Sequence, residues 1–152
     1  MEIQNSINNA KDKIHIFKNY LVYLDEGEFL YTYDLLTNDF LLENFKINPS
    51  TSNAFFNNTL VIKNEQYLEA INILNGKSFW MTETELKKNS KILKIKNINE
   101  DLSLFTDEGK IIIIKKDNNS EVLDLKIKNI VSFNFLNNKV IAIQKNGKIG
   151  VF

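Results

Sequence analysis

His15 is the single histidine of the chain, and histidine is the side chain that most often serves as a general base near neutral pH. A nucleophilic triad needs that base beside a nucleophile and an orienting acid. His15 lies in an apolar stretch, residues 14–17, and the sequence contains no Gly-x-Ser-x-Gly motif. We therefore expect His15 to be a surface or hydrogen-bonded channel residue, and we expect no catalytic residue in this chain.

Carboxylates gather in two short stretches, at Asp25, Glu26 and Glu28 and at Asp107 and Glu108. Calcium takes several oxygen ligands, so these stretches could share a site if the fold brought equivalent loops together. Neither stretch has the Asp-x-Asp-x-Asp-Gly layout of a loop that binds calcium alone. The chain has no cysteine, which excludes thiolate metal sites and disulfides. We expect solvated turns, with no metal and no cofactor.

The charge pattern argues against nucleic acid as a partner. The chain carries 19 basic and 19 acidic residues, and every basic residue is lysine. Arginine is the preferred fork for phosphate and guanine, and a nucleic-acid binder usually has a basic excess. A coding bias toward lysine, asparagine and isoleucine explains the missing arginine without reference to function. The five glycines all stand in or beside expected turns, so no phosphate cradle is expected either.

The elements that would position these residues repeat along the chain. Units of short strands recur at a spacing of roughly 40 residues, each with an Asn-rich first turn and an acidic or Gly-containing second turn. Asn, Asp and Gly tolerate the positive φ of tight hairpins, and turns are expected at residues 57–58, 100–101, 107–109, 137–138 and 146–147. The expected units cover residues 12–44, 52–82, 91–126 and 129–152. The pattern predicts an all-β chain, a β-propeller or partial propeller of about four antiparallel blades. Three blades should be four-stranded and the last incomplete.

Helix is the competing interpretation at only two places, residues 8–17 and 83–89. Elsewhere no apolar stripe repeats at helical spacing over ten residues or so. Residues 1–152 should form a single domain, because no Pro-, Ser- or Gly-rich linker divides the chain.

The second unit carries the most specific motif, in which Ala70, Asn72, Asn75, Gly76 and Trp80 mark a strand, a turn and the next strand. This spacing resembles the repeat of quinoprotein-type (pyrroloquinoline-quinone-like) β-propellers, and more broadly of WD40-like propellers. The first unit carries a weaker version at Asp34, Thr37 and Asn38, with Leu42 in the tryptophan position. The resemblance implies blade packing and not a quinone, since the same repeat occurs in cofactor-binding dehydrogenases and in cofactor-free envelope scaffolds.

Within this motif, Asn75 and Gly76 should form a two-residue hairpin turn. Asn72 should bond the turn backbone, and Trp80 should pack against the neighbouring blade. A contact between Trp80 and a ligand or partner is the alternative. Tyr31 and Tyr33 share one face of their strand, and either an inter-blade core or a partner surface would suit them. Tyr31, Tyr33 and Trp80 are therefore the candidate partner contacts.

Two architectures remain open for the ring. Residues 2–7 would close it by supplying the missing outer strand of the last blade. Alternatively the chain is an arc, either part of a larger propeller or half of a two-chain ring. We favour the arc slightly, because the sequence ends at Phe152 within the blade pattern.

The most economical function is a non-catalytic scaffold or protein-interaction module with a protein partner or self-association. A ligand- or glycan-binding propeller is the alternative, and a fragment of a quinoprotein-type oxidoreductase is a weaker one. No apolar run approaches the roughly 20 residues of a membrane span, and the first residues lack a signal-peptide pattern. As written the chain fits the cytoplasm, or the periplasm or cell envelope if an export signal has been trimmed.

Overall fold

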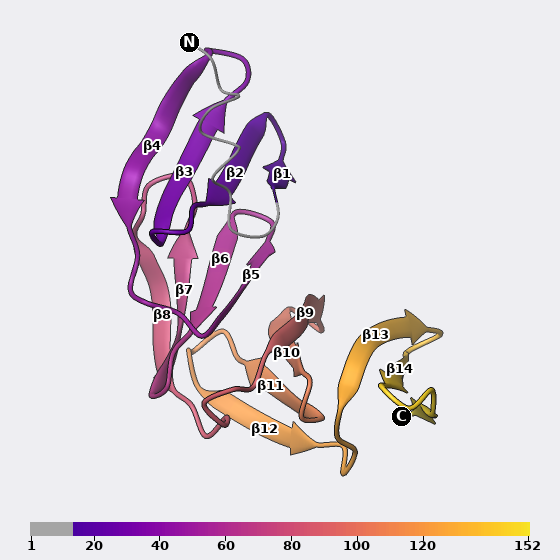
Figure 1. The fold of residues 1–152 in the computed structure, drawn as a ribbon. Helices are drawn as coiled ribbons and strands as arrows, with labels where there is room; N and C mark the ends of the chain where they lie inside the picture. Colours follow the sequence, from indigo (N-terminus) through magenta and orange to yellow (C-terminus); the bar gives the residue numbers. More distant parts are fainter. Residues whose placement is uncertain (1–13) are drawn as a thin grey trace.

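The computed structural model describes residues 14–152, which form fifteen strands in four antiparallel sheets (Figure 1). Each sheet is a meander in which every strand pairs with the next strand in the sequence. Three sheets have four strands and the last has three. The prediction of an all-β chain with three complete blades and one incomplete blade is confirmed.

The blades are numbered 1 to 4 along the chain. Blade 1 consists of β1 (His15–Phe17), β2 (Tyr20–Leu24), β3 (Phe29–Asp34) and β4 (Asp39–Lys46). Blade 2 consists of β5 (Ser52–Phe56), β6 (Thr59–Lys63), β7 (Tyr67–Asn72) and β8 (Ser78–Glu83). Blade 3 consists of β9 (Ile92–Ile98), β10 (Asp101–Thr106), β11 (Lys110–Ile114) and β12 (Ser120–Asp124). Blade 4 consists of β13 (Ile130–Leu136), β14 (Lys139–Gln144) and β15 (Ile149–Val151).

Turn chemistry explains where the strands end. Asn137 and Asn138 both have positive φ between β13 and β14, as does Gly147 between β14 and β15. In blade 3 the first turn uses Asn99 and Glu100, both at positive φ, so that Asp101 already pairs with Ile98. That turn lies one residue earlier than the sequence pattern indicated.

The helix considered for residues 83–89 is wrong. β8 runs to Glu83, and the backbone N–H of Thr84 then donates to the carbonyl of Gln66. Leu86 is buried in the core between blades 2 and 3, and the segment ends in a turn in which the N–H of Ser90 donates to the carbonyl of Lys87. Of the other helix candidate, the described part from His15 belongs to strand β1. Residues 2–7, considered as a closing strand, lie outside the described residues.

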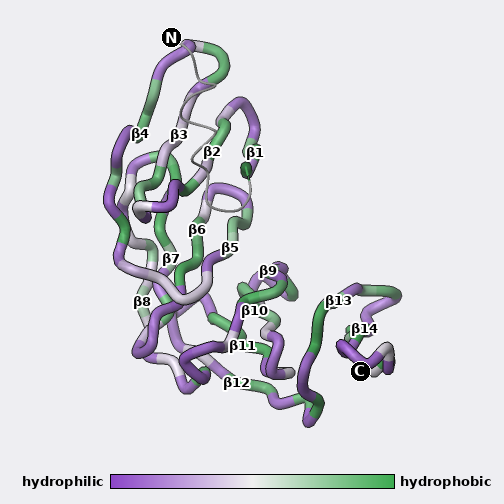
Figure 2. The backbone as a smooth tube through the Cα atoms, in the orientation of Figure 1, coloured by the Kyte–Doolittle hydropathy of each residue, from purple (hydrophilic) through white to green (hydrophobic). Residues whose placement is uncertain are grey.

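The hydrophobic core lies between neighbouring blades. Successive side chains of a strand point to opposite faces of its sheet. The sheets of blades 2 and 3 can therefore each pack against two neighbouring blades. The three buried clusters of the described chain are centred on Val22, Leu30, Leu60 and Ile71 (blades 1 and 2), on Val61, Ala70, Leu104 and Ile112 (blades 2 and 3), and on Phe105, Ile111, Phe133 and Ala142 (blades 3 and 4). Figure 2 shows the hydrophobic stretches along β6 and β13 that supply such residues.

The four blades form an open arc. The first strand of each blade faces the concave side, and β9 lies against both β5 and β13 (Figure 1). Blades 1 and 4 stand at opposite ends, and none of the clusters in residues 14–152 joins them. At each end of the arc, one sheet face therefore has no neighbouring blade packed against it.

Candidate functional site

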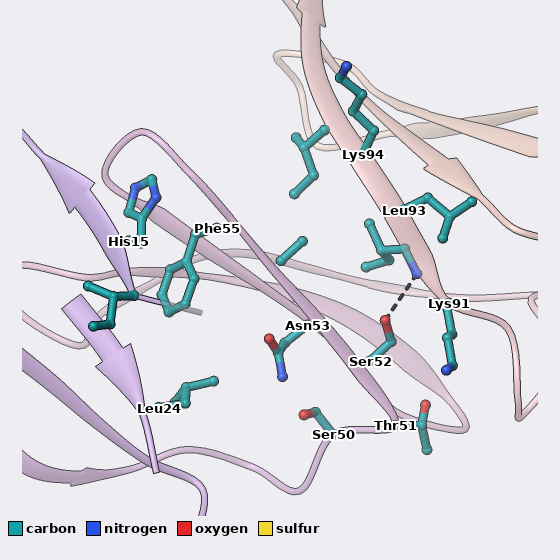
Figure 3. Close-up of a pocket in the computed structure, with 14 residues that line it drawn as sticks. His15, Leu24, Ser50, Thr51, Ser52, Asn53, Phe55, Lys91, Leu93 and Lys94 are labelled. Atoms are coloured by element: carbon teal, nitrogen blue, oxygen red, sulfur yellow. Dashed lines mark hydrogen bonds between the residues drawn. The ribbon is translucent and has the colours of Figure 1, made fainter. Parts of the chain in front are cut away.

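A hollow of about 670 Å³ opens on the concave side of the arc, between β1, β5 and β9 (Figure 3). Its lining includes His15, Asn53, Phe55, Lys91 and Lys94. These residues come from the first strands of blades 1 to 3 or from just before β9, so the hollow follows the axis of the arc.

His15 is held in this hollow by two contacts. Its Nε2 atom lies 2.7 Å from the carbonyl oxygen of Asn57, and its ring stacks on Phe55 with centroids 5.1 Å apart. Figure 3 shows the two rings side by side. A ring nitrogen that donates to a backbone carbonyl holds its proton in that structural hydrogen bond. The expectation of a hydrogen-bonded channel residue is confirmed.

Other polar groups of the hollow tie blades together. Ser52 Oγ accepts from the backbone N–H of Ile92 at 3.0 Å, which links β5 to β9 (Figure 3). Lys94 Nζ donates to the carbonyl of Phe133 at 3.2 Å and lies 5.3 Å from the centre of the Phe135 ring. These side chains are positioned by inter-blade contacts.

The acidic turns accept hydrogen bonds from the backbone and from a serine hydroxyl. Asp25 Oδ1 accepts from the N–H of Phe29 at 2.9 Å, and Asp107 Oδ1 accepts from the N–H of Lys91 at 2.9 Å and from Ser90 Oγ at 3.2 Å. Across residues 14–152, no group of three or more His, Asp or Glu side chains is arranged to hold a metal ion. Asp25 thus caps its own turn, whereas Asp107 binds the segment that precedes β9.

The blade 1 end face is the side of that sheet turned away from blade 2. The strand register places on it Ile16, Leu21, Tyr23, Tyr31, Tyr33 and Phe40. Tyr23 and Tyr31 stack at 4.8 Å, and Phe40 meets Tyr33 edge-on at 5.1 Å. Tyr23 is only 1% exposed and Tyr33 4%, whereas Ile16 is 66% exposed, so only part of this face is open to solvent.

Tyr31 is the polar centre of this face. Its hydroxyl donates to Asn44 Oδ1 at 2.6 Å and lies 3.4 Å from Asp25 Oδ2. Burial, followed by the negative charge of Asp25, raises the pKa of Tyr31 above its usual value of 10.0. Tyr31 is therefore a neutral hydrogen-bonding phenol at physiological pH, bordered by acidic groups.

The blade 4 end face is the side of that sheet turned away from blade 3. The register places on it Ser132, Asn134, Leu136, Lys139, Ile141, Ile143, Ile149 and Val151. Ile149 is 66% exposed, Leu136 61% and Val151 58%. No strand in the described part of the chain pairs with the outer edge of β15. This end of the arc offers an aliphatic surface beside an open strand edge.

The three predicted contact residues lie in two different places. Tyr31 and Tyr33 lie together on the blade 1 end face and belong to none of the three inter-blade clusters. Trp80, on β8, pairs with Ala70 and packs against the cluster between blades 2 and 3. The expected packing of Trp80 against the neighbouring blade is confirmed, and this places it away from the two tyrosines.

Sequence reasoning missed the blade 4 end face. Its signal was the alternation Ile141, Ile143 and Ile149, Val151, which indicates strands with one apolar face. The alternation predicts an apolar face, but only the arrangement of the blades shows that no neighbour covers it.

Comparison with known proteins identifies the fold. No protein-family model and no curated protein matches this chain. Among solved structures, BamB from Moraxella catarrhalis matches with a TM-score of 0.62 and 14% identity, covering 93% of this chain and 42% of that chain. The WD40 domain of SCAP from fission yeast matches with a TM-score of 0.62 and 14% identity, covering 93% and 41%.

The computationally designed Ika4 protein matches with a TM-score of 0.60 and 17% identity, covering 93% of this chain and 91% of that chain. These likenesses confirm the β-propeller fold, and at such identities they show the fold alone. The chain spans less than half the length of the BamB and SCAP chains, whereas it spans nearly the whole of Ika4.

Proposed function

We propose that this protein is a non-catalytic β-propeller scaffold that binds protein at the ends of its arc, chiefly through the exposed blade 4 end face. The observation that carries the proposal is the contrast between covered and uncovered blade faces. Leu60 and Leu104 are fully buried against a neighbouring blade, whereas Ile149 on the blade 4 end face is 66% exposed. Contiguous exposed apolar surface on a soluble domain marks an interaction site.

The composition of the two faces suits a protein partner. Tyrosine and phenylalanine are enriched at protein interfaces, and Tyr31 combines a ring for packing with a hydroxyl for hydrogen bonding. The edge of β15 adds a row of backbone groups that a partner strand can pair with. Residues 14–152 contain no helix long and apolar enough to cross a membrane.

Other solved structures that match this chain support the same class of function. One is described as the complex of the fission yeast SREBP and SCAP binding domains, with a TM-score of 0.62 and 13% identity. Another is described as BBS1N in complex with ARL6DN, with a TM-score of 0.59 and 12% identity. Propellers of this shape thus serve as binding partners of other proteins, and we extend that role to this chain.

The axial hollow supports a glycan or small-ligand function less well than the end faces support a protein-binding function. A sugar site needs an exposed aromatic face with free polar groups around it, but the Phe55 ring is stacked against His15. Ser52 and Lys94 are occupied by contacts between blades. The end faces therefore carry the proposal.

Site-specific photocrosslinking tests it. A photoreactive phenylalanine analogue is placed at Tyr31, at Ile149 and, as control, at Met81, which is 54% exposed on the outer strand of blade 2. In the cells that produce the protein, we expect covalent adducts with one defined protein from positions 31 and 149 and none from position 81. Adducts from all three positions alike, or from neither end face, would overturn the proposal.

A further inference from the structure

A second hollow, of about 450 Å³, lies between the outer strands of blades 2 and 3. It opens where the end of β8 comes beside the start of β12 (Figure 1). Blades 2 and 3 each have a neighbouring blade on both faces, so this hollow is separate from the end faces of the arc. We call it the outer groove, and its lining includes Leu68, Thr82, Glu83, Glu85, Lys110 and Val122.

The strand register explains why the outer groove is open. In blade 1, Leu30 of the third strand pairs with Phe45 of the outer strand, and in blade 2 Leu68 pairs with Thr82. Each leucine is the second residue of its third strand and is buried against the following blade. Phe45 and Thr82 thus hold the same place in successive blades, and a threonine stands in blade 2 where blade 1 has an aromatic ring.

Phe45 shows what a ring does at this place. It packs against the core between blades 1 and 2, and its ring lies so close to the turn after β7 that a Cβ on Gly76 would come within 2.5 Å of it. At the next interface, the Thr82 hydroxyl lies 3.4 Å from Ser120 Oγ. The space that a phenylalanine fills between blades 1 and 2 is therefore bordered between blades 2 and 3 by two small hydroxyl side chains.

The floor of the outer groove is apolar. Leu68, Leu86 and Ile112 are buried there, and Val122 beside them is 41% exposed. Val122 lies on the face of β12 that is turned toward blade 2, because it pairs with Ile112 of the core between blades 2 and 3. An apolar side chain that enters the groove would remove Val122 from water, and the burial of apolar surface is favourable.

The rim of the outer groove favours a cationic partner. Glu83 and Glu85 line it, and within the described residues neither carboxylate takes part in an ion pair. The basic residue of the lining is Lys110, whose amine lies 3.4 Å from the carbonyl of Glu85 and which pairs across the strands with Asp124. Positive groups of a partner would therefore meet two free carboxylates, and such complementarity gives specificity.

We infer that the outer groove binds an extended segment of another protein, which inserts one aromatic side chain flanked by basic side chains. The ring takes the place that Phe45 takes at the preceding interface, and the basic groups reach Glu83 and Glu85. Side chains two residues apart share a face of an extended chain, so the pattern recognised is basic-x-aromatic-x-basic. This site goes beyond the proposed function, because it uses a surface apart from the end faces.

Peptide binding to the full chain, measured by fluorescence anisotropy, gives the first test. The probe is labelled Lys-Thr-Phe-Thr-Lys, and its Ala-centred counterpart should bind at least tenfold more weakly. Thr82→Phe fills the groove from within, so the probe should bind this variant at least tenfold more weakly than wild type. The matched control is Met81→Phe, which adds the same ring at a 54% exposed position on the opposite face of β8, and it should bind as wild type does.

Reversing the charge of the rim gives the second test, at two exposed positions that leave the blade cores intact. The double variant Glu83→Lys, Glu85→Lys should prefer Glu-Thr-Phe-Thr-Glu to the lysine probe, and wild type should show the opposite preference. The inference is overturned by a wild-type protein that does not bind the lysine probe. Equal binding of the Phe-centred and Ala-centred probes, or undiminished binding by Thr82→Phe, would overturn it as well. Crosslinking from Tyr31 and Ile149 tests the end faces separately, so the proposed function and this inference can fail independently.

Discussion

At the scale of single residues, polar side chains buried between blades define how the sheets fit together. Thr32 and Lys63 are both fully buried, although Thr and Lys usually lie at the surface. Thr32 donates to the carbonyl of Ile73 in the loop after β7, and Lys63 donates to Thr51 and Lys88 in the links that join blade 2 to blades 1 and 3. A buried polar group is tolerated only when it is bonded, so these residues specify the position of the neighbouring blade.

Replacing Thr32 with Val should destabilise the protein by about 1 to 2 kcal/mol, because the carbonyl of Ile73 loses its buried donor. The shape of the side chain is nearly unchanged, so the loss reports the hydrogen bond. Urea unfolding measures it. The matched control is Thr82→Val, where the hydroxyl lies 3.4 Å from Ser120 Oγ at an exposed site. That variant should stay within about 0.5 kcal/mol of wild type, and equal losses in both would contradict the prediction.

Because of Lys63, the free energy of unfolding should change with pH in the alkaline range. Its amine donates to Thr51 Oγ1, the carbonyl of Asn64 and the carbonyl of Lys88 at 3.0 to 3.3 Å. Burial lowers the pKa of Lys63 below 10.5, and the nearby charges of Glu108, Asp107 and Glu65 oppose this only in part. The folded protein therefore releases this proton at a lower pH than the unfolded chain does. Between the two pKa values the unfolded chain binds more protons, so this residue's contribution to stability rises with pH.

We expect the free energy of unfolding of wild type, relative to that of Lys63→Met, to increase as the pH is raised toward 10.5. Denaturant unfolding of both proteins over that range measures the difference. A difference that is flat or falls with pH would contradict the prediction.

At the scale of elements, side chains that bond the next turn recur in the hairpins. Asn72 Oδ1 accepts from the N–H of Leu74 at 2.9 Å, which confirms the role expected for it. In blade 1, Asp34 Oδ1 accepts from the N–H of Leu36 at 2.8 Å. This hydrogen bond is the main cause that lowers the pKa of Asp34. The motif of the second unit thus marks a side-chain-capped turn that also occurs in the first unit.

Two hairpin glycines allow a matched experiment. Gly109 and Gly147 have φ of 80° and 81°, but a Cβ on Gly109 would lie 2.0 Å from the carbonyl oxygen of Ile127, whereas one on Gly147 would meet nothing within 4 Å. Gly147→Ala should cost about 1 to 2 kcal/mol from backbone strain alone. Gly109→Ala should cost at least about 1 kcal/mol more, because the link between blades 3 and 4 must move. Thermal or urea unfolding of both variants gives the comparison, and equal costs would show that the close approach to Ile127 carries no energy.

At the scale of the whole molecule, stability should fall toward the ends of the arc. Blades 2 and 3 are packed on both faces, whereas blades 1 and 4 have a neighbouring blade on one face only. In stacked repeats, local stability depends on the number of neighbour interfaces. Blade 4 also has the fewest strands of the described blades.

Hydrogen exchange should detect this gradient. Amides of β14 should exchange faster than those of β6 and β10, the equivalent strands of the inner blades. Mass spectrometry of peptides from each strand measures the rates. Faster exchange in β6 than in β14 would contradict this picture.

Much of the fold was predictable because its signals are local. Alternating apolar residues and Asn, Asp or Gly turns predict strands and hairpins within a few residues. The first turn of blade 3 was misplaced by one residue. The two-residue hairpin expected at Asn75 and Gly76 is wrong, because β7 ends at Asn72 and β8 begins at Ser78, with the N–H of Gly76 donating to the carbonyl of Asn72. The helix considered at residues 83–89 failed because the burial of Leu86 between two blades outweighs local helix preference. Trp80 was correctly expected in blade packing, since its place in the repeat determines its neighbours.

The sequence by itself determined the strands, their turns and the number of blades, because these depend on the period of side chains and the φ preference of turn residues. Only the tertiary structure decided that Tyr31 and Tyr33 lie at one end of an arc, that Ile149 lies at the other, and that His15 is bonded to Asn57. Whether an apolar face is covered depends on sheets that are distant in sequence and on the curvature with which they stack. Neither is encoded in the periodicity of a single strand.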